Sequence, residues 1–175
     1  MSVRNHWLAY NQEPGFTFLE LVIVIMVLGI ITMMAMPAMN DFLTDETINA
    51  AADATVTAIH YARATAITTG VPHRVIFDPE ANCFQIEKHV SGVPPEEVFE
   101  AAQNPLTKRD YLVSFTAEGT GLQGVRVGTA LFGEANYVRF DNLGAPMEVG
   151  FVMLEYGGRS RKIGVTATSC EISFS

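Results

Sequence analysis

Three patterns of apolar residues follow one another along the chain. From Leu21 to Met39 the residues form an uncharged apolar run in which Thr32 is the only polar side chain. From Ile48 to Ile67 apolar residues recur three and four positions apart, which is typical of an amphipathic helix. After Pro72 apolar and polar residues alternate, as in half-buried strands. The pattern predicts an α+β fold: a long N-terminal helix, membrane-spanning in its first half and amphipathic in its second, packed on a head of antiparallel β-sheets.

The predicted helix begins at Phe16 and ends near Thr69. Pro37 should bend or locally unwind it, because proline lacks a backbone donor and clashes with the preceding turn. Gly70 and Pro72 should end it, since glycine suits the left-handed position after a helix and proline cannot continue one. The expected buried stripe of the second half is Ile48, Ala52, Val56, Ile59, Ala62 or Arg63, and Ile67.

Short strands with turn signals between them fill the rest of the chain. Consecutive short strands favour antiparallel sheets. The segment 91–109 contains three prolines and is expected to be a surface loop. The predicted strands are 74–78, 83–89, 111–115, 125–127, 137–140, 151–156, 163–166 and 172–174.

A single acid, Glu20, lies at the head of the apolar run. An ionised side chain inside hydrocarbon costs ~2.5–3.5 kcal/mol on insertion scales, so a carboxylate there needs a positive partner. No Lys or Arg occurs from Gly15 to Ala62. If the chain were cut after Gly15, Phe16 would expose a new α-amine in the same apolar layer, and a neighbouring copy could offer that amine to Glu20. The sequence therefore predicts an intermolecular ion pair.

Gly15-Phe16-Thr17-Phe18-Leu19-Glu20 resembles the processing motif of type IV prepilins and type II secretion pseudopilins. The resemblance implies a cleaved leader (1–15), a transmembrane and assembly helix segment (16–39) and a periplasmic head (40–175). It implies cleavage between Gly15 and Phe16 by a prepilin peptidase, N-methylation of Phe16, and an assembly role for Glu20.

Further segments of the chain resemble the GspH/FimT family of minor pseudopilins and minor pilins. They are Ala62-Arg63-Ala64-Thr65-Ala66-Ile67 before Gly70, Val75–Asp78, Val138-Arg139-Phe140-Asp141-Asn142-Leu143-Gly144, and Lys162-Ile163-Gly164-Val165-Thr166. The resemblance implies a subunit at or near the tip of a short periplasmic filament, built with other pseudopilins or pilins. Two functions stay open: a structural subunit of a type II secretion system, or a FimT-like minor pilin of a type IV pilus that contacts DNA.

Charge placement sets the expected topology. Arg4 and His6 precede the apolar run, whereas Asp41, Asp45 and Glu46 follow it. By the positive-inside rule, the N-terminus should stay in the cytoplasm and the head should be periplasmic, anchored by a single pass in the bacterial inner membrane. The alternative is an ordinary secretory signal cut near Ala38, but such signals have an apolar core of only ~7–15 residues, and this run is longer.

The chain contains two cysteines, Cys83 and Cys170, and the expected topology places both outside the cytoplasm. Disulfides persist in oxidising compartments, so the pair could form a bridge between the middle of the head and its last strand. The alternative is two buried free thiols, and spacing alone does not decide between them.

Other groups suggest no catalytic chemistry. The net charge of −8 opposes non-specific nucleic-acid binding, although Arg159, Arg161 and Lys162 form a small basic island beside a Gly-Gly turn. His60, His73, His89 and Cys83 lack the spacing of a zinc site. Oxygen ligands at Asp141, Asn142 and Glu148 do not form a calcium loop. We therefore expect no enzymatic activity, no metal, no cofactor and no nucleic-acid partner.

Overall fold

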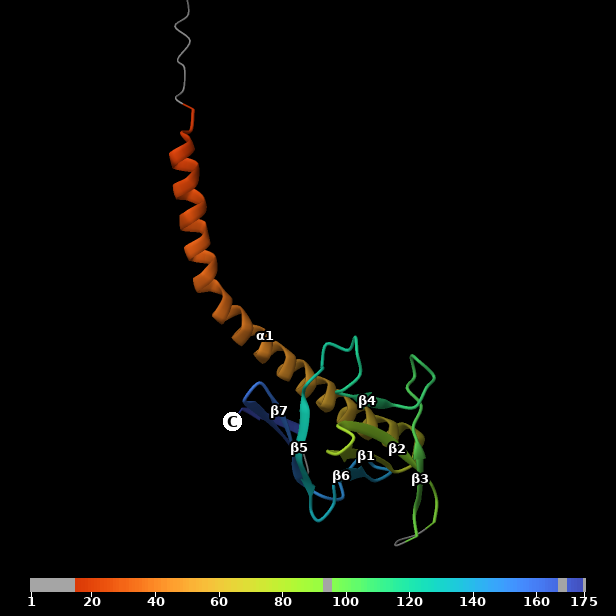
Figure 1. Cartoon of the computed structure of the whole chain (residues 1–175). Helices are drawn as coiled ribbons and strands as arrows, with labels where there is room; N and C mark the ends of the chain where they lie inside the picture. The colour runs from red at the N-terminus through yellow and green to blue at the C-terminus, as the bar shows by residue number, and fades with distance from the viewer. Residues whose placement is uncertain (1–14, 93–95, 167–169, 175) are drawn as a thin grey trace, which may run out of the picture. The chain divides into compact units, whose positions relative to one another are not determined.

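Helix α1 (Phe18–Thr69) precedes the strands of the described part of the chain (Figure 1). The computed structural model describes residues 15–92, 96–166 and 170–174, without the side chains of 35–38 and 170–174. The helix begins at Phe18 rather than at the predicted Phe16, and it runs through Pro37 without a break, so the local unwinding expected there does not occur. Internal contacts divide the chain into two units, Met1–Asn40 and Asp41–Ser175.

The part of α1 in the first unit is apolar and exposed. Among the described residues, α1 is the one helix that is long and apolar enough to cross a membrane, with a mean hydropathy of 2.7 in its most apolar window and none of that window buried. A hydrocarbon core about 30 Å thick needs roughly 20 such residues. Burial in lipid or among other helices would remove this apolar surface from water.

The second half of α1 buries one face in the head. The buried residues recur three and four positions apart, as an amphipathic helix requires. Alanine supplies most of them, and Ile67, predicted to be buried, is exposed while Ala66 takes its place. Small side chains let the helix backbone approach the sheets closely. The buried helical residues are Ile48, Ala51, Ala52, Thr55, Ala58, Ile59, Ala62 and Ala66.

The described strands form two antiparallel sheets. The first has the order β3-β2-β1-β6, with β4 also paired to β2. Its strands are β1 (His73–Asp78), β2 (Cys83–Ser91), β3 (Val98–Ala101), β4 (Leu112–Ser114) and β6 (Tyr137–Phe140). The second has the order β5-β7-β8-β9, and consists of β5 (Arg126–Phe132), β7 (Gly150–Tyr156), β8 (Arg159–Val165) and β9 (Cys170–Phe174).

Strand β3 corrects the sequence prediction. It lies inside the segment 91–109 that was expected to be a surface loop, and it pairs with β2. The prolines flank this short strand rather than interrupt it. Its residues alternate between exposed and half-buried, so its hydrophobic pattern is weak.

Among the described residues, one hydrophobic core joins the second half of the helix to both sheets. Phe77 of β1 stacks on Phe132 of β5 with the ring centroids 5.8 Å apart, so aromatic packing bridges the two sheets. The side chain of Asn82 also links them: its Nδ2 donates to the Val125 carbonyl at 2.6 Å, and its Oδ1 accepts from the Val127 amide at 2.7 Å. The antiparallel α+β fold predicted from the sequence is confirmed.

Candidate assembly site

Thr17 caps the N-terminus of α1. Its Oγ1 accepts a hydrogen bond from the Glu20 backbone N–H at 3.2 Å, and its carbonyl accepts one from the Leu21 N–H at 3.2 Å. Thr17 is therefore the N-cap of α1, a position that favours Thr because the first helical N–H groups lack partners within the helix. The Thr-x-x-Glu spacing also matches a capping box.

The bond between Gly15 and Phe16 lies outside the helix. Both residues precede the N-cap, and neither has helical structure. Phe16 is 88% exposed. A peptidase needs access to an unwound backbone, so the position of the cap leaves this bond available, whereas a bond within the helix would be enclosed in its hydrogen-bonded ladder.

Glu20 lies in the first turn of α1, surrounded by exposed apolar side chains. The partial positive charge of a helix N-terminus favours a carboxylate there, but that effect contributes only ~0.3–1 kcal/mol at the surface. Within the part of the chain that the structure describes, no cation pairs with Glu20. In an apolar layer, the energetic cost of the Glu20 charge must therefore be offset mainly by another, positively charged group.

The one polar side chain in the apolar run is satisfied locally. Thr32 Oγ1 donates to the Leu28 carbonyl, one turn earlier, at 2.8 Å. This bond removes the cost of an unpaired hydroxyl in hydrocarbon. Glu20 is thus the polar group of this segment that depends on a partner.

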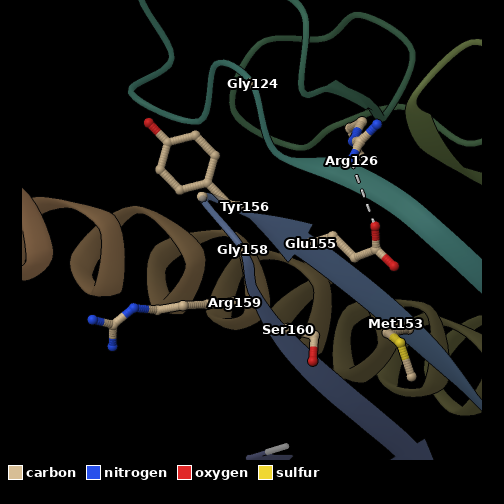
Figure 2. Close-up of a pocket in the computed structure, with 9 residues that line it drawn as sticks. Gly124, Arg126, Met153, Glu155, Tyr156, Gly158, Arg159 and Ser160 are labelled. Atoms are coloured by element: carbon tan, nitrogen blue, oxygen red, sulfur yellow. Dashed lines mark ion pairs between the residues drawn. The ribbon is translucent and has the colours of Figure 1, made fainter.

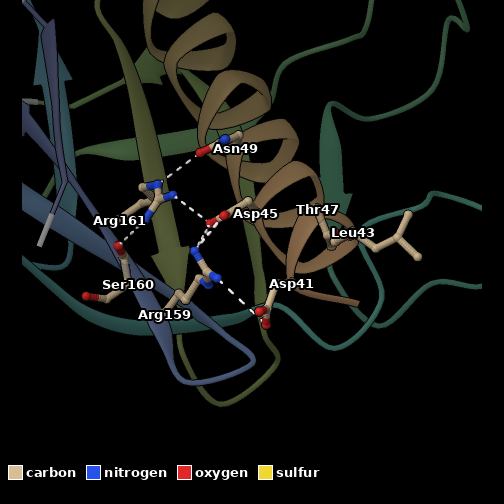
Figure 3. Close-up of polar contacts among 8 residues, drawn as sticks. All are labelled: Asp41, Leu43, Asp45, Thr47, Asn49, Arg159, Ser160 and Arg161. Atoms are coloured by element: carbon tan, nitrogen blue, oxygen red, sulfur yellow. Dashed lines mark hydrogen bonds and ion pairs between the residues drawn. The ribbon is translucent and has the colours of Figure 1, made fainter. Parts of the chain in front are cut away.

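Two of the three cations of the basic island at the β7–β8 turn, Arg159 and Arg161, are paired with the helix (Figure 3). Arg159 Nη1 donates to both carboxylate oxygens of Asp45 at 2.5 Å. Arg161 donates from Nη2 to Asp45 at 3.3 Å and from Nε to Asn49 at 2.9 Å. Asp41 lies 3.9 Å from Arg159. Two carboxylates thus neutralise two guanidinium groups, and the cluster joins β8 to α1.

A shallow pocket of about 510 Å³ flanks the same turn (Figure 2). Arg126 and Glu155 form a wide ion pair across it at 3.8 Å, and both side chains are substantially exposed. Tyr156 and Arg159 also line it. An exposed pair of this kind contributes only ~0–1 kcal/mol to stability.

Cys83, at the start of β2, is a free thiol in the structure. Burial, with a smaller contribution from the negative charge of Asp78, raises its pKa, so it is less reactive than an exposed cysteine. The side chain of Cys170 lies outside those described. The bridge between the two cysteines stays a prediction.

The candidate metal ligands do not converge. Within 15–92, 96–166 and 170–174, no group of three or more His, Cys, Asp or Glu side chains could hold a metal ion. Asp141 instead stabilises its own turn, since Oδ1 accepts from the backbone N–H groups of Leu143 and Ala145 at 2.9 and 2.8 Å. His60 is exposed on α1, whereas His73 and His89 line one groove of the head.

The described residues thus combine a capped apolar helix, headed by one acid, with a head of two antiparallel sheets. Residues 11–36 match the family model of the prokaryotic N-terminal methylation motif. The chain is 43% identical over 73 residues to the type IV narrow pilus major component PilA5 of Thermus thermophilus, a match that covers 39% of this chain and 62% of that relative. It therefore spans less than two thirds of that relative's length.

A solved structure has the same fold. The minor pseudopilin EpsH from the type 2 secretion system of Vibrio cholerae superimposes with a TM-score of 0.54, covering 73% of this chain and 96% of that one. Because the sequences are only 11% identical, this likeness concerns the fold alone. It agrees with the long helix and the antiparallel sheets predicted from the sequence.

Proposed function

We propose that this chain is a minor pseudopilin of a type II secretion system, a structural subunit at or near the tip of a periplasmic filament. The observation that carries the proposal is Glu20, a carboxylate without a partner among the described residues, in the first turn of an exposed, membrane-length helix. The structural likeness to a minor pseudopilin, which covers 73% of this chain, supports the choice of system.

In the proposed mechanism, the apolar part of α1 first anchors the precursor in the inner membrane, with the head in the periplasm. The unassembled helix is stable in the bilayer because its backbone N–H and C=O groups are hydrogen-bonded within the helix. Prepilin peptidase then cuts between Gly15 and Phe16, and N-methylation leaves the new amine charged. Assembly brings that amine of one subunit to Glu20 of the next, in a bundle of sister helices.

The head contributes surfaces rather than catalysis in this proposal. The peptidase and the assembly motor perform the chemistry, and the chain itself needs no cofactor. Its contacts are with other pseudopilin or pilin heads, which fix its place in the filament.

Processing at Gly15 is the first test. We expect the mature membrane protein to begin with N-methylated Phe16, because this bond precedes the Thr17 cap and lies outside the helix. Intact-mass measurement of the protein purified from membranes checks the expectation. A mature chain that is uncut, or that begins at or after Met39, would refute the assignment to prepilin-like subunits.

The second candidate function is that of a FimT-like minor pilin of a type IV pilus. The partial identity with a pilus component favours it. Membership can be decided by the neighbouring genes and by co-purification, since secretion-system subunits would support the first function and pilus subunits the second.

DNA contact separates the two functions further. We expect the full chain to bind duplex DNA no better than ~10⁻⁴ M at physiological salt, the weak end of non-specific binding. Arg159 and Arg161 are already neutralised by Asp45 and Asp41, and the chain carries a net charge of −8. A gel-shift titration measures this affinity. Micromolar binding that disappears in an Arg159→Ala/Arg161→Ala double variant would favour the pilus function instead.

A further inference from the structure

A groove of about 440 Å³ lies between the end of α1, strand β2 and the segment after β3. Its volume is in the ~300–1,000 Å³ range of ligand pockets. Tyr61 forms one apolar wall and stacks on Tyr111 with the ring centroids 5.1 Å apart. We call it the head groove. It is lined by Tyr61, Thr65, Thr69, Val71, His73, Lys88, His89, Val90, Ala102 and Gln103.

The charge of the head groove is opposite to that of the whole chain. Its described lining contains one lysine and two histidines but no carboxylate, although the chain has 19 acidic residues. Lys88 makes no ion pair with any described residue. Glu100 is its cross-strand neighbour on β3, and the two charged groups are not paired. The groove therefore favours an anionic group over a cationic one.

His73 adds a hydrogen-bond acceptor. The residue is 3% exposed, and its Nδ1 lies 2.8 Å from the Val71 carbonyl, so Nδ1 carries the proton and donates it. Burial, followed by the positive charge of Lys88, lowers the pKa of His73 against the opposing effect of the Val71 bond, which favours the neutral ring. In that state Nε2 is an acceptor, and it has no partner among the described residues.

We propose that the head groove binds an acidic peptide segment of another protein, in which a carboxylate lies next to an aromatic or aliphatic side chain. Lys88 holds the carboxylate, His73 Nε2 accepts a backbone N–H of the peptide, and the side chain packs on Tyr61. A fatty acid or another simple amphiphile would offer the anion and the apolar group but no N–H donor. The proposal therefore commits to a peptide, and it holds for either kind of filament.

Three small probes test these features one at a time. N-acetylphenylalanine carries a carboxylate, an amide N–H and a ring. Its amide derivative lacks the charge, and 3-phenylpropionate lacks the N–H. Each probe is titrated into the full-length chain in detergent, with ¹³C-labelled histidine observed by NMR. His60 is exposed on α1 outside the groove and reports non-specific effects.

We expect saturable shifts of the His73 resonance with N-acetylphenylalanine at millimolar concentration, and at least fivefold weaker binding of the other two probes. Lys88→Gln should weaken binding at least fivefold, whereas Glu100→Gln should strengthen it about twofold by removing the competing carboxylate. Lys108→Gln, which changes an exposed lysine outside the groove, is the matched control and should leave binding unchanged.

Three results would overturn the proposal. Equal binding of 3-phenylpropionate would assign the groove to carboxylate amphiphiles, such as lipids, rather than peptides. Equal loss in the Lys88→Gln and Lys108→Gln variants would show a non-specific charge effect. Absence of probe binding, with a change of oligomeric state in Lys88→Gln, would assign the groove to a second copy of this chain.

Discussion

Glu20→Ala should insert into the membrane at the normal level and yet be almost absent from the assembled filament complex. Alanine makes the segment more apolar, so the anchor is retained. What is lost is the one carboxylate near the head of the apolar run, and with it the proposed partner of the Phe16 amine in the neighbouring subunit. Immunoblots of the membrane fraction and of the purified complex measure the two quantities.

The expected effect is large because the remaining charge stays buried. Removing one partner of a buried ion pair costs ~3–5 kcal/mol. At about 1.4 kcal/mol per tenfold, this corresponds to incorporation weaker by roughly 10²-fold to 4 × 10³-fold. Such a difference excludes a subunit from a filament in which normal copies compete for the same place.

Glu46→Ala is the matched control. Glu46 is also an exposed acid of α1, but it lies beyond the apolar run and makes no ion pair within the described residues. We expect it to be incorporated normally. If Glu20→Ala were incorporated as well as Glu46→Ala, the intermolecular pair would be refuted as the basis of assembly.

The helix could be predicted from the sequence because its signals are local. Gly70 and Pro72 end the helix as expected. The recurrence of apolar residues three and four positions apart correctly predicted that Ile48, Ala52 and Ile59 are buried. The predicted start at Phe16 lies two residues before the observed one, because Thr17 is the N-cap and the helix begins after it. The Thr-x-x-Glu spacing before the apolar run was the available signal.

The alanines on the buried face of α1 were harder to predict. Alanine is common on every face of a helix, so hydrophobicity alone does not show that Ala51, Ala58 and Ala66 pack against the head. Their burial depends on the close approach of the sheets, which is a tertiary property.

Long-range pairing could not be read from the sequence at all. Asp45 and Arg159 are 114 positions apart, and they meet only because β8 packs beside α1. From the sequence, Asp41 and Asp45 indicate the topology, whereas Arg159 and Arg161 belong with Lys162 to a small basic island. The structure shows instead that the two aspartates and the two arginines form one neutral cluster.

The second large effect is expected at Gly150, the first residue of β7. A Cβ atom there would lie 2.1 Å from the Leu131 carbonyl oxygen and 2.6 Å from Phe132 Cα. Both atoms belong to the backbone of β5, which is hydrogen-bonded to β7 in this register. The Phe132 ring is fully buried and stacks on Phe77. Strand β5 therefore cannot move away from β7 without disturbing the packing of the core.

Gly150→Ala should therefore reduce the free energy of unfolding by ~3 kcal/mol or more, at or above the usual ~1–3 kcal/mol cost of overpacking. With roughly 2–4 °C per kcal/mol for a chain of this size, the thermal midpoint should fall by about 10 °C. Circular dichroism of the full-length chain in detergent, followed through thermal unfolding, measures the change.

Gly128→Ala provides a matched control on β5. A Cβ atom there would lie 3.0 Å from Glu155 Oε1, the end of a flexible side chain that is 44% exposed and can move aside. The same chemical change should thus shift the midpoint by only a degree or two, because surface substitutions usually stay within about 0.5 kcal/mol. Equal midpoints for the two variants would show that the β5–β7 ladder yields to an added methyl group. The close backbone contact at Gly150 would then not be what requires glycine at the start of β7.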